Sequence, residues 1–289
     1  MKLRAATRGS PLAMWQTRHI ASMLKEHGVE VEPVIVQTGG DKDQKSPLHE
    51  IGGQGIFVKE IQSCVIEGQA DFAVHSLKDL PSDLPSALTL ASVPDRGDPR
   101  DALVGSMLKD LKPRARVATG SIRRKSQLAA IRPDISFYEL RGNIHTRLEK
   151  AKDFDAIIVA ATAIERLGLN PEVIELFEPN VMIPQVGQGA IGLECLRSNL
   201  DVAHALQKIE IASIRSLVDI ERSFLKEIGA DCSHPVGAHA SIEENQIRIR
   251  SFLCDNETGK NFRDDRIGSD SQTLGKLAAK ELLHRLEKQ

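Results

Sequence analysis

The regular alternation of strand-like and helix-like segments constrains the fold of this chain more than any other feature. Short apolar runs at residues 2–7, 29–38 and 70–77 have the composition of strands, and helix-like segments at 10–28 and 55–69 separate them. Strands that alternate with helices usually pair in parallel, because each helix carries the chain back across the sheet. The first part of the chain is therefore expected to form a parallel sheet covered by helices.

A second alternating set occupies residues 102–184, and the segments 93–105 and 183–195 at its two ends are rich in proline, glycine or charge. This arrangement predicts an α/β fold with two doubly wound lobes joined by two crossings, similar to type II periplasmic binding proteins. Such lobes enclose a cleft, and ligands of doubly wound folds bind at the carboxyl ends of the strands. We therefore expect the site between the lobes.

The remaining sequence has a different pattern. A long helix-like segment spans 209–229, strand-like alternation runs through 237–262, and an amphipathic helix is expected near 271–287. The pattern predicts a small C-terminal α+β domain that carries Cys232 on its first loop. The expected boundaries are 1–95 with 190–208 for the first lobe, 99–185 for the second lobe, and 212–289 for the C-terminal domain.

Composition and missing motifs exclude several function classes. Lysine and arginine number 38 against 40 aspartates and glutamates, so the formal net charge is −2. A chain with this balance has no general field for nucleic acid or membrane surfaces, and any basic site must be built locally. We expect no membrane span, no secretory signal and no glycine-rich nucleotide loop. The scattered cysteines favour a cytoplasmic protein with reduced thiols.

Basic and hydroxyl side chains recur at three expected strand-to-helix turns. Backbone N–H groups at a helix start attract anions, and arginine binds carboxylates with two parallel hydrogen bonds. One arginine alone is more often a solvated helix-end charge, but the repetition favours a site for a ligand with several negative groups. The residues are Arg8 and Ser10 at the first turn, Thr119, Ser121, Arg123 and Arg124 at the second, and Arg141 and Arg147 at the third.

A fourth strand end carries a different chemistry. The apolar strand at 70–77 ends with His75 and Ser76 near its carboxyl end, and Lys78 and Asp79 follow it. Asp79 is a candidate general acid or base, and its carboxylate is also suited to stabilising a developing cation. The competing interpretation is an ordinary Asp-Leu-Pro turn with a surface ion pair.

Cys232 lies in the segment "GADCSHPVGAHA" and allows several interpretations. The spacing of Cys232, His234 and His239 fits no common zinc site, so we expect no metal. A disulfide with Cys254 and an inert buried thiol are further alternatives. The glycine- and proline-rich surroundings favour an exposed, reactive thiol.

Segments distributed in order over nearly the whole chain resemble the porphobilinogen deaminase family, also called hydroxymethylbilane synthase. Most of this resemblance lies in the two expected lobes. The matching segments are "ATRGSPLAMWQ", "GIFVKE", "ADFAVHSLKDLP", "DRGDPRDALV", "TGSIRRKSQL", "LRGNIHTRL", "FDAIIVAATAIERLGL", "VGQGAIGLEC" and "GADCSHPVGAHA".

The resemblance implies a specific reaction. The family condenses four porphobilinogen molecules head to tail into hydroxymethylbilane and releases ammonia, in the pathway to haem. It uses a dipyrromethane cofactor held by a thioether to a loop cysteine, which corresponds to Cys232. The catalytic aspartate corresponds to Asp79. Cofactor contacts correspond to Lys78, Thr119, Ser121, Arg123, Arg124 and Arg141, and substrate contacts to Arg8, Ser10, Lys59, Arg147 and Arg166.

Residues 39–55 depart in part from the family pattern. Their polar, glycine-rich composition fits a lid or a plain surface loop equally well. The family often has a lysine where this chain has Gln54, so the lid is expected to engage carboxylates less strongly, or through Lys42 or Lys45.

A non-enzymatic alternative is an anion-binding or effector-sensing protein with the same two lobes. It accounts for the arginine turns but not for the third domain and its cysteine. The family resemblance also leads us to expect a monomer.

Overall fold

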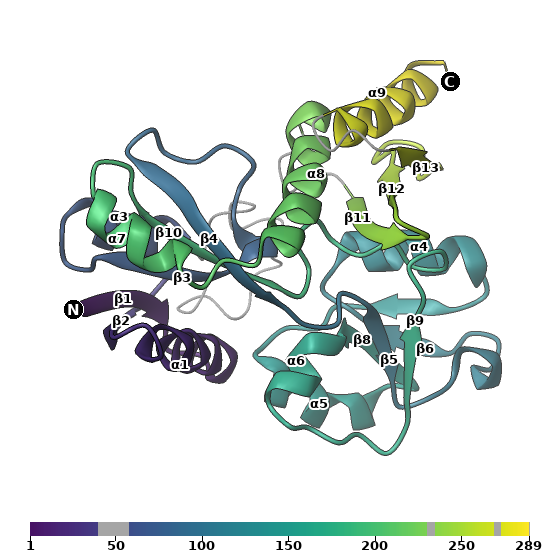
Figure 1. Ribbon diagram of the computed structural model, residues 1–289. Helices are drawn as coiled ribbons and strands as arrows, with labels where there is room; N and C mark the ends of the chain where they lie inside the picture. Colours follow the sequence, from purple (N-terminus) through teal and green to yellow (C-terminus); the bar gives the residue numbers. More distant parts are fainter. Residues whose placement is uncertain (40–57, 230–234, 269–272, 289) are drawn as a thin grey trace.

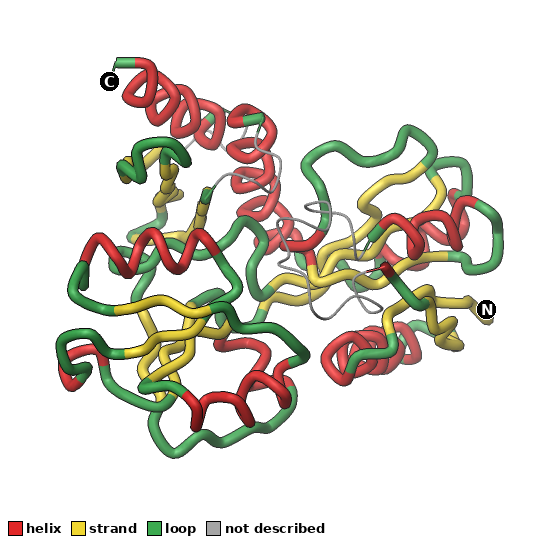
Figure 2. The backbone as a smooth tube through the Cα atoms, turned by 180° about the vertical axis from the view of Figure 1, so that it is seen from behind, coloured by secondary structure: helices red, strands yellow, loops and turns green. Residues whose placement is uncertain are grey.

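A computed structural model describes residues 1–39, 58–229, 235–268 and 273–288. Within these ranges the chain forms two five-stranded sheets and one three-stranded sheet. Helices flank the strands of both larger sheets (Figure 2). The predicted fold class is therefore confirmed: two α/β lobes are joined by two crossings, and a small α+β unit follows them (Figure 1).

The first sheet has the strand order β2-β1-β3-β10-β4. Its strands are β1 (Lys2–Arg8), β2 (Glu30–Val36), β3 (Phe72–Ser76), β4 (Leu88–Arg96) and β10 (Ala190–Leu196). The strands β1, β2 and β3 are parallel as predicted, but β10 runs antiparallel to both β3 and β4. The expected purely parallel sheet was wrong in this respect, because β10 re-enters the lobe from the opposite direction after the second lobe is complete.

Side-chain alternation along these strands builds two cores, one on each face of the sheet. Leu3 and Ala5 point toward α1 (Pro11–Lys25) and α7 (Leu200–Gln207), whereas Ala6 points toward α3 (Lys59–Ile66). Successive side chains of a strand face opposite sides, so the apolar runs of β3 and β10 are the sequence signature of strands buried on both faces.

The second sheet repeats the design with the order β7-β6-β8-β5-β9. Its strands are β5 (Asp101–Val104), β6 (Arg116–Ala118), β7 (Ser136–Tyr138), β8 (Ala156–Ala160) and β9 (Ile174–Phe177). The helices are α4 (Ile122–Ile131), α5 (Ile144–Lys150) and α6 (Ala161–Arg166), with the short 3-10 helices η2 (Leu108–Asp110) and η3 (Ala151–Asp153). Helix α4 covers one face, and α5 and α6 cover the other.

The C-terminal elements are two helices and an antiparallel sheet. They are α8 (Ala212–Ile228), β11 (Val236–Glu243), β12 (Gln246–Cys254), β13 (Asn261–Gly268) and α9 (Leu274–Glu287). The apolar faces of α8 and α9 pack on the sheet, where Phe224 and Leu282 are fully buried. Helix α8 also lies against β4 of the first lobe, and β13 contacts α4 of the second. No helix in the described part of the chain is long and apolar enough to cross a membrane.

The two crossings between the lobes touch each other. The backbone N–H of Gly97 in the first crossing donates to the carbonyl oxygen of Gly189 in the second, at 3.1 Å. Gly189 has a φ of +86°, and a Cβ atom there would lie 2.5 Å from the Gly97 oxygen. Only glycine satisfies both the left-handed backbone and this close approach.

A buried carboxylate joins these crossings to the C-terminal unit. Glu221 of α8 is fully buried and lies 2.8 Å from Arg96, at the start of the first crossing. It also accepts 2.8 Å hydrogen bonds from the backbone N–H groups of Gly187 and Ala240. Burial alone raises the pKa of Glu221, but Arg96 and His239 outweigh it and lower the pKa to about 2.

Removal of this carboxylate is expected to destabilise the protein strongly. Glu221→Ala leaves the Arg96 guanidinium buried without its partner, so we predict a loss of about 3–5 kcal/mol in the free energy of unfolding. Urea denaturation measures this change. The matched control on the same helix is Asp219→Asn, whose 2.9 Å pair with Arg215 is half-exposed. That variant is expected to lose less than about 1 kcal/mol, and equal losses for the two variants would contradict the prediction.

Candidate active site

Side chains from the strand ends of both lobes meet between the lobes. Arg8 ends β1, and Lys78 and Asp79 lie in the 3-10 helix η1 (Leu77–Asp79) directly after β3. In the second lobe, Arg124 lies in the first turn of α4, and Arg147 lies in α5 after β7. The predicted placement of a basic site at the carboxyl ends of strands agrees with this arrangement.

Arg147 is partly buried and lies in the field of several other charged groups. Its pKa is lowered to about 10, chiefly by burial and then by Arg124, Arg141 and Arg8, whereas Asp79 opposes them. Groups that shift one another's titration in this way lie close together. Three arginines and Asp79 therefore act electrostatically on Arg147, and all five residues were predicted from the sequence.

Lys78 lies next to Asp79 in the same site. Burial lowers its pKa to about 8, Arg124 and Arg123 contribute in the same direction, and Asp79 opposes them. Its ammonium donates to Gln188 Oε1 at 3.4 Å. Among the described residues, Asp79 itself has no hydrogen bond or ion pair at bonding distance. Its carboxylate lies in the vicinity of Lys78 and Arg147 but is paired with neither.

Asp101 is a central residue of this region that the sequence reasoning did not select. It is fully buried and pairs with Arg123 at 2.8 Å and with Arg124 at 2.9 Å. Gln188 donates to the same carboxylate at 2.9 Å. Burial alone raises the pKa of Asp101, but the two arginines hold it well below its usual range. The segment "DRGDPRDALV" contained the signal, a carboxylate at the start of an apolar strand.

Arg123 keeps unused donor groups. Its Nη1 atom contacts Asp101 and donates to the carbonyl oxygen of Ile183 at 2.6 Å. Its Nε and Nη2 atoms are buried, and neither has an acceptor in the described ranges. Buried donors without acceptors are unfavourable, so these N–H groups suit an anionic ligand.

The predicted hydroxyl residues support the helix starts. Ser10 Oγ accepts from the backbone N–H of Ala13 at 3.3 Å, and Ser121 Oγ accepts from that of Arg124 at 3.4 Å. Thr119 Oγ1 accepts from the N–H of Ser121 at 3.3 Å. The predicted N-cap at Ser10 is confirmed. Each hydroxyl still has its own proton to donate.

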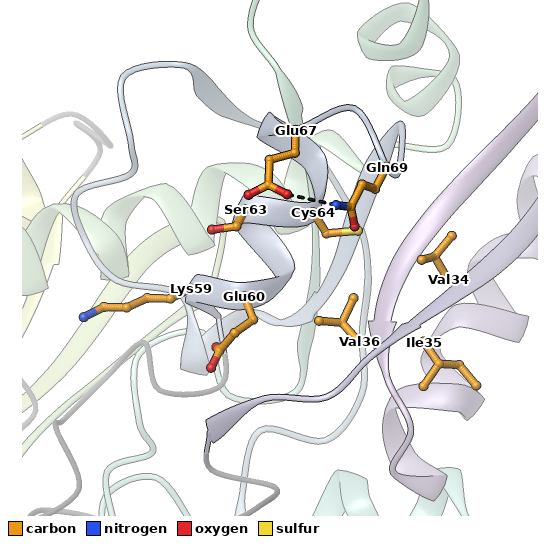
Figure 3. A pocket seen from close by; sticks show the side chains of 9 residues that line it. All are labelled: Val34, Ile35, Val36, Lys59, Glu60, Ser63, Cys64, Glu67 and Gln69. Carbon is orange, nitrogen blue, oxygen red and sulfur yellow. Dashed lines mark hydrogen bonds between the residues drawn. The ribbon is translucent and has the colours of Figure 1, made fainter.

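Three other predicted residues have different surroundings. His75 faces the α3 side of the sheet, where it lies 3.2 Å from the buried Glu194. Arg166 pairs with Asp95 at 2.7 Å. Lys59 lines a separate pocket of about 480 Å³ between β2 and α3, and its ammonium points away from the other lining side chains (Figure 3). No contact among the described residues brings Lys59 to Asp79.

Several predicted residues lie outside the described residues. They are Cys232, His234, and the lid residues Lys42, Lys45 and Gln54. The described cysteines, Cys64, Cys195 and Cys254, are free and buried. Within the described ranges, no group of three or more histidine, cysteine or acidic side chains could hold a metal ion.

The fold and the site define a two-lobed α/β protein with a locally cationic site that contains two carboxylates, Asp79 and the arginine-paired Asp101. The family model described as "Porphobilinogen deaminase, dipyromethane cofactor binding domain" matches residues 3–204, and that of the family's C-terminal domain matches residues 216–284. The chain belongs to the porphobilinogen deaminase family.

Individual relatives agree with the family match. The chain is 40% identical to a porphobilinogen deaminase from a Nitratiruptor species, over 99% of this chain and 97% of the relative. It is 43% identical to one from Roseiflexus castenholzii, over 97% of this chain and 95% of the relative. A solved periplasmic substrate-binding protein from Coxiella burnetii aligns with a TM-score of 0.46 and 13% identity, over 74% of this chain and 94% of that one.

The Lys78 environment predicts a pH-dependent cost in stability. The folded protein releases the Lys78 proton near pH 8, but the unfolded chain keeps it up to the ordinary pKa of 10.5. The destabilising effect of the Lys78 charge on the folded protein therefore decreases as the pH rises between these two values, and the free energy of unfolding increases. Lys78→Met is expected to stabilise the protein by about 1–3 kcal/mol at pH 7, and the gain should shrink toward pH 10.

Urea denaturation at pH 7 and pH 10 tests this expectation. The matched control is Lys109→Met at an exposed position. It should change stability by less than about 0.5 kcal/mol at either pH. A Lys78→Met variant whose stability matches the wild type at pH 7 would show that the site does not oppose the ammonium charge.

Proposed function

We propose that this protein is a transferase that condenses four porphobilinogen molecules into hydroxymethylbilane and releases ammonia. The observation that carries the proposal is that Lys78 and Arg147 both lie in the fields of Asp79 and of Arg124, within the part of the chain that matches the family's cofactor-binding domain. Both domains of the family are matched along the chain. The reaction needs a site for a growing pyrrole chain that carries carboxylates, and a group that accepts and donates protons. The cations offer the first and Asp79 offers the second.

The cations are proposed to bind the carboxylates of cofactor and substrate. Each porphobilinogen carries an acetate and a propionate, so negative charge accumulates as the chain grows. The protein has a net charge of −2 and must therefore concentrate its cations locally. The proposed cofactor contacts are Lys78, Thr119, Ser121, Arg123, Arg124 and Arg141, and the proposed substrate contacts are Arg8, Ser10, Lys59, Arg147 and Arg166.

The residues present fit a dipyrromethane cofactor. The buried Nε and Nη2 atoms of Arg123 need acceptors, and the pKa of Lys78 is lowered by burial and by two neighbouring arginines. Carboxylates supply both acceptors and negative charge. When bound, this group supplies the primer on which the product chain is assembled. We propose Cys232 as its attachment point.

Asp79 is proposed to be the catalytic acid and base. Loss of ammonia leaves a positive charge on the substrate pyrrole, which a nearby carboxylate stabilises. The same carboxylate accepts the proton that is lost when a new carbon–carbon bond forms. Its position at the end of β3, beside Lys78 and without a competing hydrogen bond in the described ranges, supports this role.

The remaining sequence predictions fit this function. A monomer, a cytoplasmic location, a lid at 39–55 and the division into 1–95 with 190–208, 99–185 and 212–289 stay predictions. A porphobilinogen-sized substrate and a chain of several pyrrole units are small molecules, so we propose no macromolecular partner.

The variant Asp79→Asn tests the catalytic role. The amide keeps the shape of the carboxylate but neither accepts a proton nor carries charge, so turnover should fall by at least about a hundredfold. Hydroxymethylbilane formation from porphobilinogen measures turnover. The mass in excess of the sequence should equal that of the wild type, because the proposed cofactor contacts are other residues. Near-normal turnover would refute the role of Asp79.

The mass of the purified protein tests the cofactor and its attachment. Wild-type protein should be heavier than its sequence by two linked pyrrole units, whereas Cys232→Ser should have the bare sequence mass and no turnover. Cys254→Ser is the matched control, since that cysteine is buried. It should retain the additional mass. Active wild-type protein at the bare sequence mass would contradict the proposal.

A further inference from the structure

Arg166 is already bound to groups of the protein itself. Its Nη2 atom donates to Asp95 Oδ2 at 2.7 Å and to the carbonyl oxygen of Gly189 at 2.8 Å. Its guanidinium lies over the ring of Trp15, 5.3 Å from the ring centre. An acceptor carboxylate, a carbonyl and an aromatic face are the three kinds of partner that arginine prefers. This side chain is therefore well stabilised away from any ligand.

These contacts join elements of both lobes. Trp15 lies in α1 of the first lobe, Arg166 ends α6 of the second, and Asp95 and Gly189 lie at the two crossings. His19 stacks on Trp15, with ring centres 5.0 Å apart, and lies 3.7 Å from Asp95. The Arg166 guanidinium is thus a direct link between the lobes.

The exposure of the two charged partners differs. The side chain of Arg166 is 4% exposed, whereas that of Asp95 is 29% exposed. Water thus solvates part of Asp95 but almost none of Arg166. If the pair separates, the carboxylate regains hydration easily, and the arginine needs another anion in place of Asp95.

Arg166 also faces the proposed substrate site. It lines a cavity of about 20 Å³ together with Lys78, Gln16 and Ser76. A cavity of this size holds about one water molecule and no pyrrole ring. In this structure the space beside Arg166 is therefore too small for a substrate ring.

We propose that Asp95 is an internal competitor for substrate carboxylates, which holds Arg166 on Trp15 and Gly189 until substrate displaces it. This inference rests on the proposed function, because it assigns Arg166 to a substrate carboxylate. The two ligands of Arg166 belong to the same chemical class, so one replaces the other without leaving the guanidinium unpaired. Only the molecules in which Arg166 is released from Asp95 bind substrate. The apparent Kd therefore equals the intrinsic Kd divided by the fraction of released molecules.

Kinetics of Asp95→Asn test the competition. The amide retains an oxygen that accepts from Arg166 but has no charge, so Arg166 is released more easily. The KM for porphobilinogen should fall about three- to tenfold, with kcat within about twofold of the wild type. The matched control is Glu178→Gln, which removes the exposed carboxylate that Arg100 contacts at 2.6 Å. Its KM should equal that of the wild type.

The opposite result would overturn the inference. If Asp95 instead orients Arg166 for substrate, its replacement raises KM, and if it does neither, KM is unchanged. Either outcome in an active enzyme refutes the competition alone. Wild-type protein that makes no hydroxymethylbilane refutes the proposed function, and this inference with it.

Fluorescence offers a second test on the unmodified holoenzyme. Trp15 is the single tryptophan of the chain, so its emission reports directly on the position of Arg166. Rapid mixing with porphobilinogen should change this emission in the wild type but not in Arg166→Met. The resting emission of Asp95→Asn should already be shifted in the direction that substrate produces. Identical emission with and without substrate in an active wild type would show that Arg166 stays on Trp15.

Discussion

The buried ion pair between Glu221 and Arg96 joins both crossings to the C-terminal sheet. The two crossings connect the lobes, and a group that binds both crossings restricts how the lobes lie relative to each other. Glu221 bonds to Arg96 at one crossing and to Gly187 at the other, and it also bonds to Ala240 of the C-terminal sheet. Both oxygens of this carboxylate are therefore engaged, which is the condition under which burial of a charge is tolerated.

The proposed site contains cations that repel one another. Arg147 and Lys78 are buried beside other cations, and the pKa of each is lowered as a result. The carboxylates of the proposed ligand relieve this repulsion, so the arrangement supports the binding that we propose. The protein as a whole is close to neutral, which restricts the attraction to molecules that reach the space between the lobes.

Local sequence patterns predicted the lobes, the cap at Ser10 and the cationic strand ends, because these depend on neighbouring residues. They did not predict the antiparallel course of β10, whose direction is decided by a chain segment far from its partners. Asp101 and Asp95 were also missed as site residues. Each acquires its significance only from an arginine that is distant in the sequence, 23 positions away for Asp101 and 71 for Asp95, in contacts that no local pattern encodes.

The placement of β10 also affects the order in which the two lobes fold during synthesis. The strands of the second lobe are contiguous in the chain, from Asp101 to Phe177, but the first sheet takes β10 from beyond that segment. As the chain leaves the ribosome, the N-terminal lobe has a gap between β3 and β4 that only Ala190–Leu196 fills. We expect the second lobe to fold first, although it is not the first to emerge. Until β10 arrives, the edges of β3 and β4 are open strands, the state in which a nascent chain most needs protection from aggregation.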